Sequence, residues 1–254
     1  MLHNPKPILV AVCRPATPMA ADEMKMFAKL SQMDSGIFHA VRLGDKDLNI
    51  DDELNLENYS ALLITGSQYT FTDPEDNKEE AQLLTEQRVL KIAAAALAAD
   101  FPTFGMCYGL HALTLAAGGQ LGHEGSEDIG VTQLEITDDG STDEVSAKIA
   151  QPGWAFVGHH DAVTVQPANT AVLLTSEKCR IQLLRFGENV YGSQFHPEID
   201  NQGMKLRVDY YDDGSYFPLP EKQRIYELCD NANVAAGLAV LPAFITKYFG
   251  GRHD

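Results

Sequence analysis

The sequence predicts an α/β protein with a mostly parallel central sheet, helices on both of its faces, and an antiparallel extension in the C-terminal half. Short apolar runs alternate with helical patterns as far as Gly119, which is the rhythm of βαβ units. Beyond Gly119 the strand candidates follow one another closely, which favours antiparallel neighbours. No internal repeat or linker interrupts the 254 residues, so we expect a single domain over residues 1–254.

Strands are predicted where short apolar runs are bounded by turn residues. A continuous apolar run is typical of a strand that is buried on both faces, and residues 7–13 are the first example. The runs in the parallel half are 7–13, 36–43, 60–65 and 101–106. The runs in the C-terminal half are 131–137, 154–159, 171–176, 180–186 and 189–195.

Helices are predicted between and after these strands. Thr17 followed by Pro18 has the pattern of an N-cap and a first helical position, and this helix is expected to end near residue 33. Asp73 and Pro74 are expected to open a second, longer helix. The leucines that recur on one face of that helix are Leu83, Leu90 and Leu97. Residues 221–249 are predicted to be mainly helical.

The charge of the chain excludes several kinds of partner. Lys and Arg total 19 and Asp and Glu total 36, so the formal net charge is −17, and no basic stripe offsets it. Nucleic acid and anionic membranes carry the same sign, so we expect neither as a partner. The first apolar run is too short for a signal peptide or a membrane span, and the four cysteines are scattered without a C-x-x-C pair. These features predict a cytoplasmic protein.

Residues 105–109 have the G-x-nucleophile-x-G pattern of a nucleophile elbow, at the junction of a predicted strand and a helix. Glycine is needed at positions 105 and 109 because side chains there would collide with neighbouring backbone. Cys107 would then project from a sharp turn at a helix N-terminus, where the helix dipole favours the thiolate. The alternative is an inert buried cysteine, which is the commoner role of this residue type.

A histidine and a carboxylate follow the last predicted strand. His196 and Glu198 are two positions apart, so an extended chain places both side chains on one side. Pro197 favours extended geometry at His196. In this arrangement Glu198 orients the imidazole while His196 transfers protons for a sulfur nucleophile. Alone, the pair is typical of a surface histidine beside a solvated carboxylate; together with the cysteine elbow it predicts a nucleophile, a base and an orienting group.

Five motifs give the sequence a resemblance to the triad family of glutamine amidotransferases, the Cys-His-Glu class that includes the glutaminase part of GMP synthetase. The matching segments, between about residues 60 and 200, are Leu-Ile-Thr65-Gly66-Ser67, Gly-Met-Cys107-Tyr-Gly, Ala117-Gly-Gly-Gln-Leu, His159-His-Asp161-Ala-Val and Gln194-Phe-His196-Pro-Glu198. The resemblance implies a flavodoxin-like α/β fold and attack of Cys107 on a γ-glutamyl amide. Release of ammonia or an amine, and then hydrolysis of the thioester by water, would follow.

The resemblance also implies two donors for the oxyanion that develops during acyl transfer. By its position in the elbow, the backbone N–H of Tyr108 is one donor. In the family the second donor lies in the loop after the third strand, and residue-by-residue matching points to the N–H of Ser67. This loop reads Thr65-Gly66-Ser67-Gln68 where the family has Ser-Gly-Gly-Pro, and Gly66 is expected to contact substrate. The lost glycine restricts the loop, which leaves open whether the oxyanion hole is preformed.

Two further departures from the family concern the substrate. Family members that use glutamine generally carry glutamine four residues after the cysteine, where its amide meets the substrate, whereas this chain has His111. His111 offers different hydrogen bonds there, or else it packs under the elbow helix. Gly158-His159-His160-Asp161 stands where the family has Ser-His-Gly-Asp, and Gly158, His160 and Asp161 are expected to line the substrate pocket. Two adjacent histidines do not converge well on one ion, so no metal site is expected.

These features favour thiol-dependent hydrolysis of a γ-glutamyl amide. His111 in place of glutamine slightly favours a small-molecule γ-glutamyl substrate other than free glutamine. One alternative is a glutaminase subunit that delivers ammonia to a separate synthase, because the chain has neither a P-loop nor a Ser-Gly-Gly-x-Asp-Ser nucleotide loop. The other is a non-catalytic binding protein on the same scaffold, against which the intact Cys107, His196 and Glu198 argue. No cofactor is expected.

Overall fold

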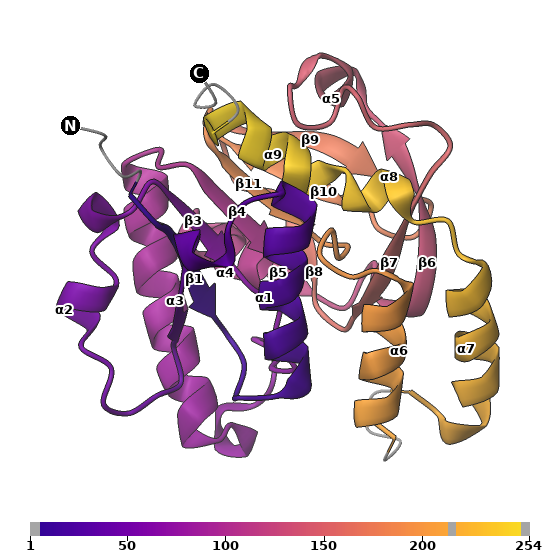
Figure 1. The fold of residues 1–254 in the computed structure, drawn as a ribbon, viewed down its shortest axis with the longest axis horizontal. Helices are drawn as coiled ribbons and strands as arrows, with labels where there is room; N and C mark the ends of the chain where they lie inside the picture. The colour runs from indigo at the N-terminus through magenta and orange to yellow at the C-terminus, as the bar shows by residue number, and fades with distance from the viewer. Residues whose placement is uncertain (1–5, 213–216, 250–254) are drawn as a thin grey trace.

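A mixed sheet forms the centre of this computed structural model, which describes residues 6–212 and 217–249 (Figure 1). The strands are β1 (Ile8–Val12), β2 (Phe38–Arg42), β3 (Ala61–Ile64), β4 (Thr103–Met106), β5 (Gln120–Gly122), β6 (Glu127–Ile136), β7 (Gly153–His159), β8 (Ala162–Val165), β9 (Thr170–Thr175), β10 (Leu183–Phe186) and β11 (Val190–Ser193). The main sheet has the order β2-β1-β3-β4-β11-β10-β9-β6-β7, and β5 pairs separately with β8. Neighbours from β2 to β11 are parallel, and those from β11 to β7 are antiparallel. The predicted mostly parallel sheet with an antiparallel extension in the C-terminal half is therefore confirmed.

Helices cover both faces of the parallel region (Figure 1). The helices are α1 (Pro18–Ser31), α2 (Ile50–Glu53), α3 (Glu80–Ala98), α4 (Tyr108–Ala116), α5 (Asp138–Thr142), α6 (Asn201–Tyr210), α7 (Lys222–Asn231), α8 (Ala235–Leu238) and α9 (Val240–Phe249). Successive residues of β1 point to opposite faces, because side chains alternate along a strand. Val10 packs in the cluster that contains Phe27 of α1 and Phe244 of α9, whereas Leu9 packs in the cluster that contains Val89 of α3.

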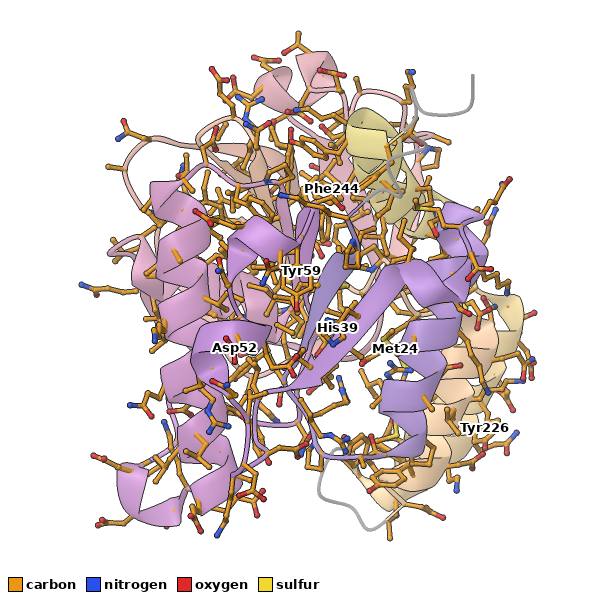
Figure 2. The ribbon with its side chains drawn as sticks, turned by 60° about the vertical axis from the view of Figure 1, so that its left-hand side comes forward. Met24, His39, Asp52, Tyr59, Tyr226 and Phe244 are labelled. Atoms are coloured by element: carbon orange, nitrogen blue, oxygen red, sulfur yellow. The ribbon has the colours of Figure 1, made fainter. Side chains whose placement is uncertain are left out.

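Aromatic rings fill the face that α9 covers. Phe244, labelled in Figure 2, lies edge-on to Phe104 of β4 at 5.3 Å between ring centroids. It is also edge-on to Tyr191 of β11 at 5.9 Å. Because β4 and β11 are neighbouring strands, this packing holds together the two strands that lead into the candidate active site.

A third apolar cluster supports the antiparallel extension. Phe156 of β7 packs in it with Met204 of α6 and Ile225 of α7. Ile199, between β11 and α6, packs in the same cluster, so the segment that follows β11 is anchored between β7 and the helices α6 and α7, which lie side by side (Figure 1).

The predicted N-terminus is confirmed for helix α1 and wrong for helix α3. The Thr17 hydroxyl accepts from the N–H of Ala20, so the predicted N-cap is confirmed. The longer helix does not open at Asp73 and Pro74, because a short 3₁₀ helix occupies Glu75–Asn77 and α3 begins at Glu80.

Two of the recurring leucines of α3, Leu90 and Leu97, are partly buried and pack against the core, but the third does not. Leu83 is 39% exposed. The fully buried apolar residues of α3 are Val89, Ile92, Ala93 and Ala96. Their spacing follows the 3.6-residue period of a straight helix on a sheet, whereas a seven-residue repeat drifts around such a helix.

Several short elements were not predicted. The small sheet of β5 and β8 and helix α5 have too few residues for a periodic signal. The aliphatic residues of α6, which are Met204, Leu206 and Val208, alternate instead of recurring at a helical spacing. Within residues 6–212 and 217–249, no single helix is long and apolar enough to cross a membrane. Leu219–Asn231 and Ala235–Phe249 pass that test only as a pair, with a bend of 68° between them.

Candidate active site

Cys107 lies in a sharp turn between β4 and α4, as the elbow pattern predicts. Its φ and ψ angles are 49° and −96°, and residues other than glycine rarely have a positive φ. A Cβ on Gly105 would lie 2.6 Å from the carbonyl carbon of Gly109, and a Cβ on Gly109 would lie 2.7 Å from the carbonyl oxygen of Ile64. Glycine at both positions therefore lets the strand and the helix approach closely enough to hold Cys107 in this turn.

The strand order explains why His196 lies beside Cys107. β11 pairs in parallel with β4, and Ser193 is opposite Met106. The N–H of Cys107 donates to the carbonyl oxygen of Ser193 at 2.7 Å. The carboxyl ends of the two strands therefore meet, and the segment after β11 carries His196 over the elbow.

His196 and Glu198 form a buried ion pair. Nδ1 of His196 lies 2.8 Å from Oε1 of Glu198. Burial would lower the pKa of His196, but the Glu198 carboxylate and a hydrogen bond with Cys107 raise it to about 10. Burial would raise the pKa of Glu198, but the charge of His196 lowers it. At neutral pH the pair is thus imidazolium and carboxylate, with the imidazolium beside the sulfur.

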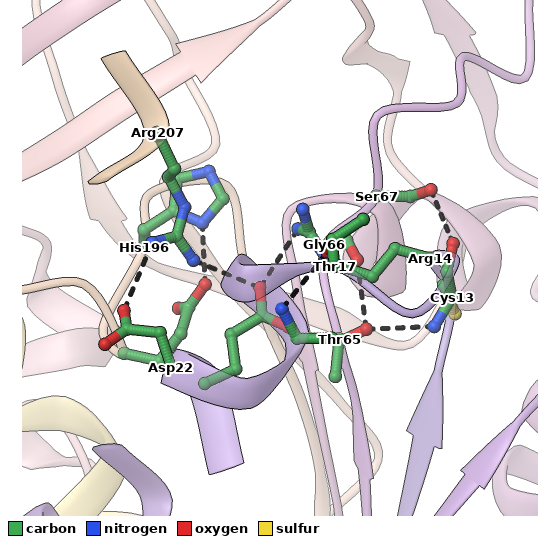
Figure 3. A network of polar contacts seen from close by, with 12 residues as sticks. Cys13, Arg14, Thr17, Asp22, Thr65, Gly66, Ser67, His196 and Arg207 are labelled. Atoms are coloured by element: carbon green, nitrogen blue, oxygen red, sulfur yellow. Dashed lines mark hydrogen bonds and ion pairs between the residues drawn. The ribbon is translucent and has the colours of Figure 1, made fainter. Parts of the chain in front are cut away.

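Hydrogen bonds fix the loop that follows β3 (Figure 3). The Thr65 hydroxyl accepts from the N–H of Cys13 at 3.0 Å and donates to the carbonyl oxygen of Gly66 at 2.9 Å. The Ser67 hydroxyl donates to the carbonyl oxygen of Cys13 at 2.6 Å. A Cβ on Gly66 would lie 3.3 Å from Cε1 of His196, so this position has little room for a side chain. The loop is held against the end of β1 on one side and against His196 on the other.

A charged cluster that the sequence analysis did not predict lies behind His196 (Figure 3). Oε1 of Glu23 lies 3.0 Å from Nη2 of Arg14 and 3.2 Å from Nη2 of Arg207. Burial raises the pKa of Glu23, although both arginines act in the opposite direction. Arg207 also helps to lower the pKa of Glu198. The signal in the sequence was a glutamate, Glu23, on the apolar face of α1.

A pocket opens above the elbow. Its lining residues are Ser67, Gln68, Tyr69, Thr70, Cys107, Tyr108, His111, Gly158, His159, His160 and Asp161. The structure therefore brings together in one pocket most of the residues predicted from the sequence. Gly66 is the predicted substrate residue outside this lining, and it packs beside His196 instead.

The loop after Ser67 packs over the elbow. The ring of Phe71 stacks on that of Tyr108, with centroids 4.3 Å apart. The N–H of Thr72 donates to a carboxylate oxygen of Asp161 at 3.3 Å. Asp161 therefore contributes to the pocket by holding this loop as well as by lining it.

His159 and His160 differ in their surroundings, although they are adjacent in the chain. His160 is exposed, whereas His159 is buried with Nε2 at 3.1 Å from Oε2 of Glu127 and Nδ1 at 2.9 Å from the carbonyl oxygen of Asp161. Glu127, His159 and Cys179 place one ligand atom each within 4.8 Å of one another, and among the described residues they are the group that could hold a metal ion. His159 bridges the Glu127 carboxylate and the carbonyl oxygen of Asp161, and these two contacts hold the turn at Asp161 in place.

His111, in the first turn of α4, is buried and lies in the wall of the pocket. Its Nε2 is 2.9 Å from Oε1 of Gln194, which begins the motif Gln194-Phe-His196-Pro-Glu198. The imidazole thus bonds to a protein side chain on the strand side of the site.

The fold is of the α/β class, and the site joins a cysteine in a strand–helix turn to a histidine–carboxylate pair. The model of the family "Glutamine amidotransferase class-I" matches residues 35–208 of the chain. The chain therefore belongs to the class I glutamine amidotransferase family, and the resemblance drawn from its motifs is confirmed.

Relatives within the family include glutamine-hydrolysing GMP synthases. That of Klebsiella pneumoniae subsp. pneumoniae is 27% identical over 157 residues, which are 59% of this chain and 27% of that protein. The GMP synthase of Escherichia coli O1:K1 / APEC has the same identity and coverage. The chain thus spans about a quarter of the length of these relatives, 27% in each case.

Solved structures have the same fold. A glutamine amidotransferase from Thermotoga maritima superposes with a TM-score of 0.72 at 18% identity, over 96% of this chain and 98% of that one. One from Methylobacillus flagellatus gives a TM-score of 0.67 at 16% identity, over 96% of both chains. The predicted flavodoxin-like α/β fold is therefore confirmed.

Cys107 is expected to be alkylated faster than the other three cysteines. Burial raises the pKa of Cys13 strongly, and raises those of Cys179 and Cys229 to about 11 in each case, so these thiols stay protonated at neutral pH. Cys107 lines the pocket and faces the His196 imidazolium. Brief treatment with iodoacetamide followed by mass-spectrometric mapping measures the four rates. Equal labelling of all four cysteines would contradict a nucleophilic role for Cys107.

Proposed function

We propose that the chain hydrolyses a small-molecule γ-glutamyl amide through Cys107, His196 and Glu198, with a glutamyl thioester as intermediate. The observation that supports this proposal is the meeting of β4 and β11, which sets the cysteine elbow beside the His196–Glu198 ion pair. A sulfur nucleophile, a proton carrier and a group that orients it are the parts that acyl transfer from an amide requires.

The acylation step follows from the charges of this group. The sulfur of Cys107, as the thiolate, attacks the γ-carbonyl carbon, and the C=O electron pair moves onto oxygen. When the tetrahedral intermediate collapses, the C–N bond breaks and the leaving nitrogen takes the proton from Nε2 of His196. Glu198 keeps its bond to Nδ1 throughout, so the ring keeps its orientation.

Deacylation reverses the role of His196. The neutral imidazole accepts a proton from water, whose oxygen attacks the thioester carbon, and the sulfur of Cys107 leaves as the thiolate with glutamate as the product. The N–H of Tyr108, at the first position of α4, lacks an acceptor within its helix and is one donor to the oxyanion. The N–H of Ser67 is the proposed second donor. The Thr65 hydroxyl donates to the carbonyl oxygen of Gly66, and in a trans peptide the N–H of Ser67 points the opposite way, away from Thr65. This fixed orientation supports a preformed oxyanion hole.

A second candidate function is that of a glutaminase subunit. The relatives named above are GMP synthases, and this chain matches 27% of the length of each. In this second function the same single domain, residues 1–254, would pass ammonia to a separate synthase. Both candidate functions use the same hydrolytic chemistry, and they differ in the leaving group and in the need for a partner.

Glutamate release is expected from the isolated chain with at least one γ-glutamyl substrate. The substrates to compare are glutamine, a γ-glutamyl dipeptide and a γ-glutamyl polyamine, with glutamate and ammonia measured separately. Turnover of the dipeptide or the polyamine above that of glutamine favours the stand-alone hydrolase. Turnover of glutamine alone favours the glutaminase subunit.

Two cysteine variants provide the controls. Cys107→Ala is expected to abolish glutamate release, whereas Cys229→Ala removes a buried thiol of α7 and is expected to retain it. A thiol-directed glutamine analogue is expected to label Cys107 and to stop turnover in parallel. Binding of substrate without label or glutamate release would instead identify a non-catalytic binding protein.

A further inference from the structure

A second polar group, besides His196, reaches the sulfur of Cys107. Gln194 directly follows β11 and is fully buried. Its Nε2 donates to Sγ of Cys107 at 3.7 Å, a distance within the range of hydrogen bonds to sulfur. Its backbone N–H donates to the carbonyl oxygen of Gln182 at 2.9 Å, which fixes the residue against β10. The backbone of Gln194 is therefore held in place, and its side-chain amide reaches the sulfur from this fixed point.

His111 holds the other end of this amide. The Nε2 atom of His111 lies 2.9 Å from Oε1 of Gln194, and both side chains are buried. Burial lowers the pKa of His111 to about 4, so the ring is neutral at neutral pH and carries one N–H. In the tautomer with the N–H on Nε2, His111 donates to Oε1 of Gln194, an amide oxygen that can only accept. With its oxygen bonded to His111, the amide directs its NH₂ group toward the sulfur.

We infer that His111 and Gln194 form a relay that positions the nucleophile, in which His111 orients the Gln194 amide and this amide donates to the Cys107 sulfur. The inference rests on the proposed function, because a donor at the sulfur matters for a thiolate. A hydrogen bond to a charged acceptor is stronger than one to a neutral acceptor, so the amide stabilises the thiolate over the thiol. It also holds the sulfur in the strained elbow on a second side. His111 is then a positioning residue that acts through Gln194, and Gln194 touches the reacting atom.

The relay makes a specific prediction for position 111. Glutamine at this position also carries an N–H that can reach an amide oxygen, whereas phenylalanine fills a similar volume without any donor. His111→Phe and Gln194→Met are expected to slow the alkylation of Cys107 by iodoacetamide about 10- to 100-fold. His111→Gln is expected to stay within about threefold of the parent, which is below half a power of ten in rate. Gln166→Met serves as the control, because the Gln166 amide bonds to Thr170 and Arg180.

The experiment combines the alkylation rate with steady-state kinetics on the substrate that the parent turns over. Loss of the relay is expected to lower kcat by the same factor as the alkylation rate and to leave KM within about twofold, because the sulfur rather than the substrate is affected. Melting temperatures identify any variant that fails to fold. Gln194→Glu, which keeps the shape but places a carboxylate at the sulfur, is a second variant and is expected to be slower than Gln194→Met.

Two results would overturn the relay while the proposed function stands. The first is parental alkylation and kcat in both His111→Phe and Gln194→Met. The second is a change in the preference of His111→Gln between glutamine and γ-glutamyl peptides, combined with parental alkylation of Cys107 in His111→Phe. That second result would assign His111 to substrate recognition. Because alkylation requires no substrate, this arm tests the relay even if no turnover of γ-glutamyl amides is found.

Discussion

Replacing His196 by alanine is expected to lower kcat by about four to six orders of magnitude, because removal of the base of such a triad costs up to about 10⁶-fold. The Nδ1 atom of His196 is 2.8 Å from Glu198, and Cys107 contributes to its raised pKa of about 10. Without the ring, the leaving nitrogen has no proton donor and the attacking water has no base. Rates of glutamate release under saturating substrate measure the effect.

Two further variants separate the role of the ring from that of its charge. Glu198→Gln keeps an oxygen that accepts from Nδ1 of His196 but removes the negative charge, so we expect an intermediate loss of about 10³- to 10⁴-fold. His39→Ala changes an exposed histidine that lies beside Tyr59 (Figure 2), and is expected to have parental activity. Full activity in His196→Ala would show that another histidine is the base, with His159 or His160 the nearest by motif.

Adding one methyl group at the elbow is expected to cause the second large effect. A Cβ on Gly105 would lie 2.6 Å and 2.8 Å from backbone atoms of Gly109, and these atoms cannot move unless α4 moves away from β4. We expect Gly105→Ala to lower the free energy of unfolding by about 1–3 kcal/mol, as overpacking of a dense core does. We also expect kcat to fall about 100-fold or more, because a small displacement of the nucleophile breaks its alignment.

Gly130→Ala is the matched control for this prediction. The nearest atom to a Cβ at that position is the carbonyl oxygen of Asp128 at 3.7 Å, which is ordinary contact. Urea unfolding and glutamate release for the two variants test the argument together. Parental stability and parental kcat in Gly105→Ala would mean that the close approach of β4 and α4 is not required for the position of Cys107.

The fold was predictable where a local rule governs a segment. The apolar run at residues 7–13 contains β1, and the capping signal at Thr17 begins α1, because both depend on neighbouring residues in the chain. The start of α3 was wrong because Pro74 satisfied the same local rule while the chain there formed a short 3₁₀ helix instead. Leu83 was wrongly grouped with the recurring leucines because its exposure depends on where the sheet lies.

The sequence predicted those groups of the site whose geometry depends only on neighbouring residues in the chain. Gly105, Cys107 and Gly109 form an elbow because the steric limits on a tight turn act within five residues. His196 and Glu198 share one side because extended chain places alternate residues together.

The sequence by itself determined the order of the elements, the elbow and the histidine–carboxylate pair. Only the tertiary structure decided what surrounds them. Pairing of β11 with β4 brings His196 to Cys107, and packing of α1 beside α6 buries Glu23 between two arginines. The bond from Gln194 to the sulfur also depends on that pairing. These contacts join residues that are distant in the chain, and their formation depends on which strands become neighbours, a choice set by the burial of the whole core rather than by any single segment.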